Sequence, residues 1–570
     1  MIDPLGFGHL QTMTCFRALA CSWLALALVG CADPTDDSGD EAGDGNDTGE
    51  VDPPLDDAAL RCAATLAPEL AAVGPTIGSI GVGPCGHAAY HDDQGQGWLI
   101  GPDGTRDEFV HASNRVAFAP TGDMLAWQPD ESGPLLLRDL LAGESAGSER
   151  TIADAGTIDA FGFVPSFADP SARGAWLWSC EQGVLSRSDA SSNELVAESV
   201  VCARVAASTG SPRLAYADLE GRVWIADLDA GTLVASDDLD WVGYDGSDRD
   251  DSLWIDHDGE VVQHLAIEWQ GDPDADSEWP VELWSRVLDR EGAVIFDEPE
   301  DMALRQAPRR GAPVFVLRQG VVRRLDAGAP SSVGGGLESA ALAGSGELFY
   351  SSTESDSDTD EILALELDVA LPPTAIGQFE THTSMLPSRG AAALSLTHHS
   401  EVCIVDALGE CERILIALRR WDREAGLAPH ELLSTTPWTV VATLDQGDTL
   451  AVGAPVEAEG PIYTGEEPTA RVLWLDPEGE IQSELPAANG NLAVRQSFWL
   501  DDDRVLFEYQ SESGQGALML AEAGQAGFVS LAPEADVALL QTWIDARAER
   551  VVFVAEQAGA TTLWFGALPQ

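Results

Sequence analysis

Short apolar runs recur along this chain from about residue 60 onward, and one kind of turn keeps returning between them. A tryptophan lies in an apolar run, an Asp- or Glu-rich turn containing glycine follows, and a second run comes after the turn. Glycine accepts the positive φ of a tight turn and aspartate caps its own backbone, so each copy predicts a β-hairpin. The copies are Trp98–Gly104, Trp178–Gly183, Trp224–Gly231, Trp254–Gly259, Trp284–Gly292 and Trp474–Gly479.

A second hairpin precedes several of these copies, most clearly at Val116–Trp127. Two successive hairpins make a four-stranded antiparallel unit, which cannot bury both of its faces alone. Neighbouring units must therefore stack. Units that begin roughly every 40 to 60 residues are typical of β-propellers.

Two segments carry a resemblance to a known class of repeat. Phe118–Trp127 (FAPTGDMLAW) resembles a strand–turn–strand element of WD40-like, TolB-type β-propellers. Phe349–Asp368 resembles the next element, in which an Asp-rich loop leads into the third strand. The resemblance implies an all-β propeller of four-stranded antiparallel blades over residues 60–570. We expect seven or eight blades, with two smaller propellers or an array of β-sandwiches as the alternatives.

The two ends of the repeat region are expected to meet. The last unit ends at Leu563–Phe565, close to the final residue of the sequence. In propellers a blade that is short at one terminus is often completed by a strand from the other. We therefore expect a segment near Leu60–Leu70 or Thr76–Val82 to complete the final blade. The segment Ile414–Arg423 fits either a helix or a long strand with its turn.

The first 30 residues predict a signal peptide, with Met13 as the true start. Arg17 precedes the apolar run Ala18–Leu28, which is too short to span a bilayer but suits the h-region of a secretory signal. Leu28–Cys31 resembles the bacterial lipobox, which implies that Cys31 is acylated and becomes the mature N-terminus. The alternatives are an ordinary signal peptide with a chance cysteine and a buried core helix. Because Ala32 rather than Asp follows the cysteine, lipoprotein sorting favours the outer membrane.

Residues 31–59 are predicted to form the lipidated cysteine and a disordered acidic tether. Asp33–Asp57 holds eleven carboxylates and no basic residue. Such a segment cannot bury apolar area and its charges repel one another, so it should be extended. A tether of this kind spaces a folded domain from a membrane.

Six cysteines lie outside the leader, an even number that suggests disulfides in an exported protein. Six cysteines allow fifteen pairings, so the sequence alone does not decide among them. Their grouping favours pairs of neighbours, with buried free thiols as the alternative. The three pairs are Cys62–Cys85, Cys180–Cys202 and Cys403–Cys411.

The charge of the chain excludes several classes of function. The formal net charge is −66, from 96 acidic and 30 basic residues, and every basic residue is an arginine. Such a field repels phosphate backbones, so nucleic acid is not an expected partner. Without lysine there is no phosphate-loop lysine and no Schiff-base lysine.

Two acidic loops have the alternating carboxylates that calcium prefers. Neither has the glycine or the twelfth-position glutamate of an EF-hand, and solvated acidic loops are the reading we favour over structural Ca²⁺ sites. No other cofactor is expected. The candidate ligands are Asp272, Asp274 and Asp276 in one loop and Asp356, Asp358 and Asp360 in the other.

Other candidate sites have ordinary readings that we prefer. His87 and His91 are four residues apart without an identifiable third ligand, so a metal site there is not favoured. The adjacent His398 and His399 should point to opposite faces of a strand. Gly143–Gly147 fits the Gly-x-Ser-x-Gly pattern of a nucleophile elbow, but the segment after it is a poor helix.

The sequence therefore predicts a non-catalytic envelope propeller, anchored to a membrane through lipid, that binds a protein or a polymer. The alternative is an envelope hydrolase or lyase whose residues converge from several blades in the central channel. No catalytic residue is assigned.

Overall fold

We describe the chain from a computed structural model in which residues 60–569 are described, with internal gaps. The longest gaps are 142–148, 237–252, 270–280, 307–313, 454–470 and 487–493, and residues 1–59, the predicted signal peptide and tether, lie outside the described part. Every regular element in the described part is a β-strand. No helix found there is long and apolar enough to cross a membrane.

The strands associate in antiparallel groups of four that follow one another in chain order. Within each group consecutive strands pair, so their connections are hairpins. The first group is the second half of β1 (Ala71–Val82) with β2 (Ala88–Asp92), β3 (Gly97–Ile100) and β4 (Arg106–Glu108). The next three are β5 (Val116–Phe118), β6 (Met124–Trp127), β7 (Leu135–Asp139) and β8 (Arg150–Ala153); β9 (Ile158–Ser166), β10 (Gly174–Glu181), β11 (Val184–Ser188) and β12 (Asn193–Glu198); and β13 (Val200–Ala207), β14 (Arg213–Asp218), β15 (Val223–Asp227) and β16 (Thr232–Ala235).

The fifth to eighth groups repeat this arrangement, and the eighth has two short outer strands that both pair with β31. They are β17 (Leu253–Ile255), β18 (Val261–Trp269), β19 (Val281–Asp289) and β20 (Val294–Pro299); β21 (Ala303–Gln306), β22 (Val314–Arg318), β23 (Val321–Asp326) and β24 (Ala329–Gly334); β25 (Leu337–Leu342), β26 (Glu347–Thr353), β27 (Asp360–Glu366) and β28 (Thr374–Phe379); and β29 (His382–Pro387), β30 (Ala393–Val405), β31 (Cys411–Asp422), β32 (Gly426–Leu427) and β33 (Leu432–Ser434).

Three further groups complete the chain. They are β34 (Thr439–Thr443), β35 (Thr449–Gly453), β36 (Arg471–Leu475) and β37 (Ile481–Pro486); β38 (Val494–Trp499), β39 (Arg504–Gln510), β40 (Gly516–Glu522) and β41 (Val529–Ser530); and β42 (Val537–Ile544), β43 (Arg550–Gln557) and β44 (Ala560–Ala567) with the first half of β1.

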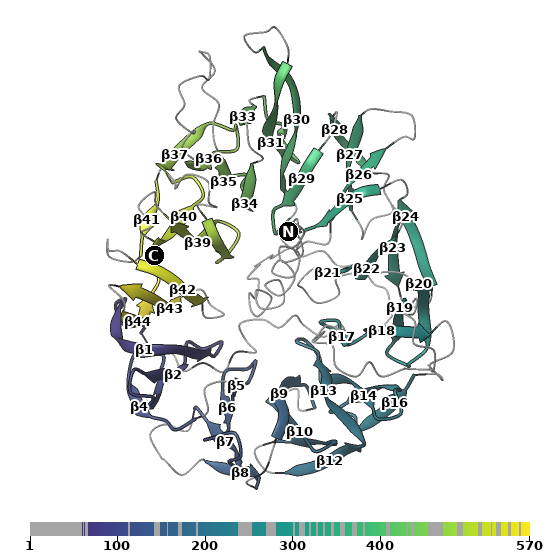
Figure 1. Cartoon of the computed structure of the whole chain (residues 1–570), viewed down its shortest axis with the longest axis vertical. Helices are drawn as coiled ribbons and strands as arrows, with labels where there is room; N and C mark the ends of the chain where they lie inside the picture. Colours follow the sequence, from purple (N-terminus) through teal and green to yellow (C-terminus); the bar gives the residue numbers. More distant parts are fainter. Residues whose placement is uncertain are drawn as a thin grey trace, which may run out of the picture.

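The groups stand side by side in a ring, with the first strand of each towards the centre (Figure 1). The yellow C-terminal strands meet the purple N-terminal strand, because β1 pairs with β44 through Ala71–Pro75 and with β2 through Thr76–Val82. One strand therefore belongs to the last and the first group, and it closes the ring. The chain is a β-propeller. We number its blades 1 to 11 in chain order and call the contact between adjacent blades a seam.

The blade count corrects the expectation of seven or eight blades or of two smaller rings, since the described strands form eleven blades in one ring. The tryptophan–glycine hairpins mark blades unevenly. Trp254 and Trp284 start two copies of the pattern but lie in the same blade, on β17 and β19. Blade 6, formed by β21–β24, contains no tryptophan.

The closing strand also differs from both predicted ranges. Ala71–Pro75, which pairs with β44, lies between Leu60–Leu70 and Thr76–Val82. Thr76–Val82 pairs with β2 and starts blade 1. A strand from the N-terminal side completes the last blade as expected, but the sequence does not show where β1 passes from one blade to the next. Ile414–Arg423 is strand through Asp422, as part of β31.

The predicted hairpins have the expected turns. Each of the six copies places its glycine between two paired strands, and that glycine has a positive φ in every copy. The φ values are 82° at Gly104, 82° at Gly183, 63° at Gly231, 68° at Gly259, 78° at Gly292 and 86° at Gly479.

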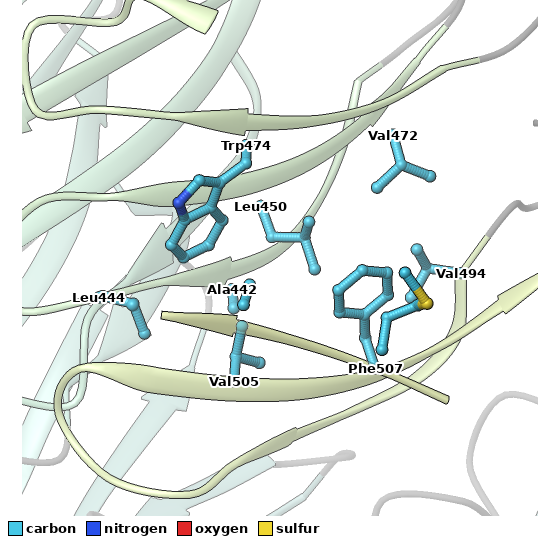
Figure 2. Close-up of a cluster of buried hydrophobic side chains, with 10 residues drawn as sticks. Ala442, Leu444, Leu450, Val472, Trp474, Val494, Val505 and Phe507 are labelled. Atoms are coloured by element: carbon cyan, nitrogen blue, oxygen red, sulfur yellow. The ribbon is translucent and has the colours of Figure 1, made fainter. Parts of the chain in front are cut away.

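The hydrophobic core lies in the seams, because each blade is covered by a neighbour on both faces. In β43 five consecutive residues, Val551–Ala555, are each at most 1% exposed. Figure 2 shows one seam, in which Leu450 and Trp474 of blade 9 face Val505 and Phe507 of blade 10. Burial on both faces explains why middle strands are continuous apolar runs rather than alternating ones.

Candidate functional site

Blade connections lie on two faces of the ring. Turns that join a first strand to a second, or a third to a fourth, lie at one end of the strands because the strands are antiparallel. We call this end the turn face; it includes residues 208–212, 256–260 and 444–448. Second-to-third connections such as 92–96 and 218–222 lie at the other end, the loop face.

The turn face of blades 4 and 5 brings a hydroxyl and an imidazole together. Oγ1 of Thr209, between β13 and β14, lies 2.7 Å from Nδ1 of His257, between β17 and β18. The His257 carbonyl accepts hydrogen bonds from the Gly210 amide at 2.9 Å and the Ser208 hydroxyl at 2.5 Å. A hydroxyl this close to an imidazole is the arrangement that activates a nucleophile. Here the same groups join two adjacent turns, so the pair is also a seam contact.

An arginine adds to the same seam. Nη1 of Arg213 donates to the Gly259 carbonyl at 3.0 Å and to Oε1 of Glu260 at 2.6 Å, while Nε lies 3.4 Å from Asp227 of its own blade. Arg290 lies 3.4 Å from the same Glu260 carboxylate. A cavity of about 190 Å³ is lined in part by Arg213, Asp227 and Arg290. Its guanidinium groups have carboxylate partners, so the cavity does not favour an anion.

Bonds between adjacent turns continue at blades 8, 9 and 10. Oδ1 of Asp445 accepts a hydrogen bond from the Gly390 amide at 2.6 Å, across one seam. The Asp445 amide donates to the Asp502 carbonyl at 3.3 Å, across the next. Nε2 of Gln446 donates to Oδ1 of Asp503 at 2.6 Å. Three blades are therefore fixed side by side through one turn.

Two charged side chains are buried just beneath these turns. Arg420 of β31 donates from Nη1 to the Asp476 carbonyl in blade 9, and Asp448 accepts from the Gly524 amide of blade 10 at 2.8 Å. Each of the two is 2% exposed. Burial raises the pKa of Asp448, and burial lowers the pKa of Arg420 to about 10 although nearby carboxylates oppose that shift. Both residues therefore connect blades at an electrostatic cost.

Arginines make such blade-to-blade bonds at several seams. The guanidinium group offers five donors in a fixed fork, so one side chain can reach a carbonyl of the next blade and keep a carboxylate partner. The bonds run from Arg115 to the Ile158 carbonyl, from Arg150 to the Asp189 carbonyl, from Arg423 to Glu347 and Glu366, and from Arg550 to the Pro102 carbonyl.

In sequence, the predicted calcium loops lie between β18 and β19 and between β26 and β27. Five of their six candidate ligands, Asp272, Asp274, Asp276, Asp356 and Asp358, lie outside the described residues. Asp360 is described, is 5% exposed and is the first residue of β27. Among the residues that the structure describes, no three His, Cys, Asp or Glu side chains are grouped to hold a metal ion.

His87 and His91 have separate surroundings in blade 1. The His87 ring faces Phe118 with 6.5 Å between centroids, whereas Nε2 of His91 lies 2.7 Å from the His111 carbonyl. Burial, together with the nearby Arg138 and Arg550 guanidinium groups, lowers the pKa of His87 to about 4. His87 is therefore neutral at physiological pH inside a seam.

Asp256 is the acidic counterpart of this buried histidine. It lies at the turn of blade 5, is 3% exposed and accepts a hydrogen bond from the Val261 amide at 2.9 Å. Burial, together with the negative charges of Asp258 and Glu260, raises the pKa of Asp256 to about 6.

Two of the predicted disulfides are present. Cys62 is bonded to Cys85 and Cys180 to Cys202, with S–S distances of 1.96 and 2.03 Å. Cys403 and Cys411 lie on the paired strands β30 and β31, but their side chains are outside the described set. Cys31 and the whole Gly143–Gly147 motif lie outside the described residues.

Sequence reasoning missed Thr209, His257 and the arginine bridges. Thr209 and His257 are 48 residues apart, close to one repeat. Equivalent turns of successive blades are neighbours in a ring, so polar residues one repeat apart were a usable signal. The absence of lysine was a second signal, because every basic side chain is then an arginine, which can donate to more than one acceptor.

No family model and no curated protein matches this chain. Among solved structures, a eukaryotic initiation factor is 10% identical over 63% of this chain and 86% of its own, with a TM-score of 0.38. The β-propeller domain of the trilobed protease from Pyrococcus furiosus is 11% identical (54% and 79% covered, TM-score 0.26), and TolB from Acinetobacter baumannii is 9% identical (54% and 80%, 0.23). At such values the likenesses carry no argument about function.

Proposed function

We propose that this chain is a bacterial cell-envelope lipoprotein, anchored in the outer membrane through Cys31, whose β-propeller binds a protein or a polymer without catalysing a reaction. The leader Met13–Cys31 supports export and acylation. The disulfides Cys62–Cys85 and Cys180–Cys202 support the same address, because disulfides persist in oxidising compartments.

The observation that carries the binding role is the use of turn-face polar groups as seam contacts. Thr209, His257 and Asp445 each bond to the neighbouring blade. Groups engaged in this way hold the ring rigid, and a rigid ring presents a preorganised surface to a partner. A catalytic group, in contrast, must be available to a substrate.

Metabolic labelling tests the anchor. Cells producing the wild-type chain should incorporate a palmitate analogue into the protein, and cells producing Cys31→Ala should not. Cys403→Ala serves as the control for loss of a cysteine elsewhere. Equal labelling of wild type and Cys31→Ala would contradict the anchor.

Site-specific photo-crosslinking in cells tests the binding role. We would place the crosslinker at Glu478, exposed on the turn face, or at Leu219, 73% exposed on the loop face. A binding module should give one adduct of fixed mass from one face and not from the other. Identical, diffuse labelling at both positions would contradict a specific partner.

The Thr209–His257 pair supports a second candidate, an envelope hydrolase or lyase. A fluorophosphonate probe should then label the wild type, and Thr209→Val and His257→Phe should abolish the labelling. Thr105→Val is the matched control, since Thr105 is also a turn-face threonine, bonded to Asp103 of its own blade. Under our proposal the probe labels none of these proteins.

A further inference from the structure

A disulfide joins the chain just before the ring-closing strand β1 to the chain just after it. Upstream lies Cys62, and downstream lies Cys85, in the turn that follows β1. These two cysteines are bonded to one another, with 5.2 Å between their Cα atoms and a sequence separation of 23. The whole of β1 therefore lies inside one covalent loop.

The strand ladder that closes the ring is short. In the ladder between β1 and β44, Ala71, Ala72, Gly74 and Pro75 face residues 562–565. One further bond runs from the Ala567 amide to the Pro68 carbonyl, at 2.8 Å. A strand at the start of a chain peels one bond at a time when its free end is pulled. This strand is thus the weak point for a pull from the N-terminal side.

The downstream end of the loop is firmly seated. Cys85 is 2% exposed. Its Sγ lies so close to Gly122 of blade 2 that a Cβ on that glycine would come within 2.1 Å of it. The disulfide therefore ties Cys62 to the packed seam of blades 1 and 2, away from the ladder between β1 and β44.

We propose that the Cys62–Cys85 disulfide is a force-bearing clamp that keeps tension on the N-terminal segment from opening the ring. A pull on any residue before Cys62 passes through the disulfide to Cys85 and blade 1. The segment between the two cysteines carries none of this force, because the disulfide joins its two ends. The source of such tension, a lipid at Cys31, rests on the proposed function, but the path of the force does not.

The second disulfide provides a matched control. Cys180–Cys202 closes a loop of nearly the same length, with a sequence separation of 22 residues. It joins β10 of blade 3 to β13 of blade 4 and encloses no ring-closing strand. The two disulfides close loops of nearly equal length but lie at different places in the ring. If removing them has different effects on the pulling trace, the difference must come from their positions.

Single-molecule pulling on the full chain tests the clamp. One handle is attached to the N-terminus and the other to an azide-bearing amino acid at Leu219, an exposed residue of blade 4. Cys62→Ser/Cys85→Ser should show an early extension of roughly 45 Å, the span of the about 13 residues released when Ala71–Pro75 leave β44, before the blades unfold. Wild type and Cys180→Ser/Cys202→Ser should lack this early step.

Reduction on the folded wild type guards against a misfolded variant. Adding a phosphine reductant to a molecule already under low tension should make the early step appear in that molecule. An early step in the untreated wild type would overturn the proposal. So would the absence of an early step both in Cys62→Ser/Cys85→Ser and in the reduced wild type. The readout does not involve acylation, so a failed palmitate experiment and a failed clamp are separate results.

Discussion

At the scale of single residues, burial in the seams sets the behaviour of the titratable groups. Desolvation is the largest cause of the shifts at His87 and at Asp256, and it favours the neutral form of each. A neutral histidine and a neutral carboxyl have opposite pH dependences. Stability should therefore respond to acid through two opposing groups, which variants can separate.

His87 should make acid conditions destabilising. Its pKa of about 4 in the fold lies below the ordinary histidine value of 6.5, so between pH 6.5 and pH 4 the unfolded chain binds a proton that the folded chain does not. Wild type should lose up to about 3 kcal/mol of unfolding free energy from this group between pH 6.5 and pH 4. His87→Gln should lack that loss in urea unfolding at each pH. A difference between the two proteins that does not vary with pH would contradict the assignment.

Asp256 should act in the opposite direction. Its pKa of about 6 lies above the ordinary aspartate value of 3.8, so the unfolded chain loses the proton first and stability falls as pH rises from 3.8 to 6. Asp256→Asn keeps an oxygen acceptor for the Val261 amide and removes the ionisation. Relative to wild type, this variant should gain up to about 3 kcal/mol between pH 4 and pH 6. The check is the same urea series, and a variant that gains stability towards acid would refute the idea.

At the scale of elements, one set of hydrogen bonds, which we call the aspartate clasp, is repeated on the loop face: an aspartate accepts from two turn amides and from a tryptophan of the next strand. In blade 4, Oδ1 of Asp218 accepts from the amides of Glu220 and Arg222 at 2.9 Å, and Oδ2 accepts from the Trp224 indole at 2.7 Å. Asp92 makes the equivalent three bonds in blade 1, with Trp98 as the indole donor. The turn and the tryptophan of the following strand are therefore one unit.

Asp218→Ala should weaken blade 4 by about 1–3 kcal/mol, since one side chain satisfies two amides and one indole. Urea unfolding measures the loss, and hydrogen exchange at the Glu220 and Arg222 amides should speed up. Glu220→Ala removes an exposed carboxylate from the same turn and should change stability by less than about 0.5 kcal/mol. Equal effects of the two substitutions would show that the aspartate clasp adds nothing.

Local geometry explains which elements the sequence revealed. The hairpin at Trp224–Gly231 needs only a glycine that accepts φ of 63° and two apolar runs, all within a short window. Blade 6 pairs its four strands without a tryptophan, so the tryptophan–glycine pattern did not mark it. The Thr209–His257 contact exists only because two blades stand side by side. Local pattern predicted the strands, and long-range stacking decided the blade count and the polar contacts.

At the scale of the whole molecule, the ring depends on how β1 divides between two blades. The first half of β1 lies beside β44, and the second half beside β2. Arg550 of blade 11 adds a bond to the Pro102 carbonyl of blade 1 at 3.0 Å. Closure removes the unpaired ends that an open array of blades would expose. Any change that lifts the N-terminal segment from β44 should therefore loosen blades 1 and 11 together.

Gly566 is the position at which a small change tests that dependence. A Cβ there would lie 2.3 Å from Cα and 2.5 Å from the backbone nitrogen of Leu70, so the N-terminal segment would have to move. Gly566→Ala should cost about 1–3 kcal/mol, as overpacking does, and should speed hydrogen exchange in 66–75 and at the Ala567 amide. Gly81→Ala is the matched control on the same closing strand, because its Cβ would meet only side chains, at 3.6 Å or more. If Gly566→Ala and Gly81→Ala gave the same exchange and the same stability, the N-terminal segment would not be what closes the ring.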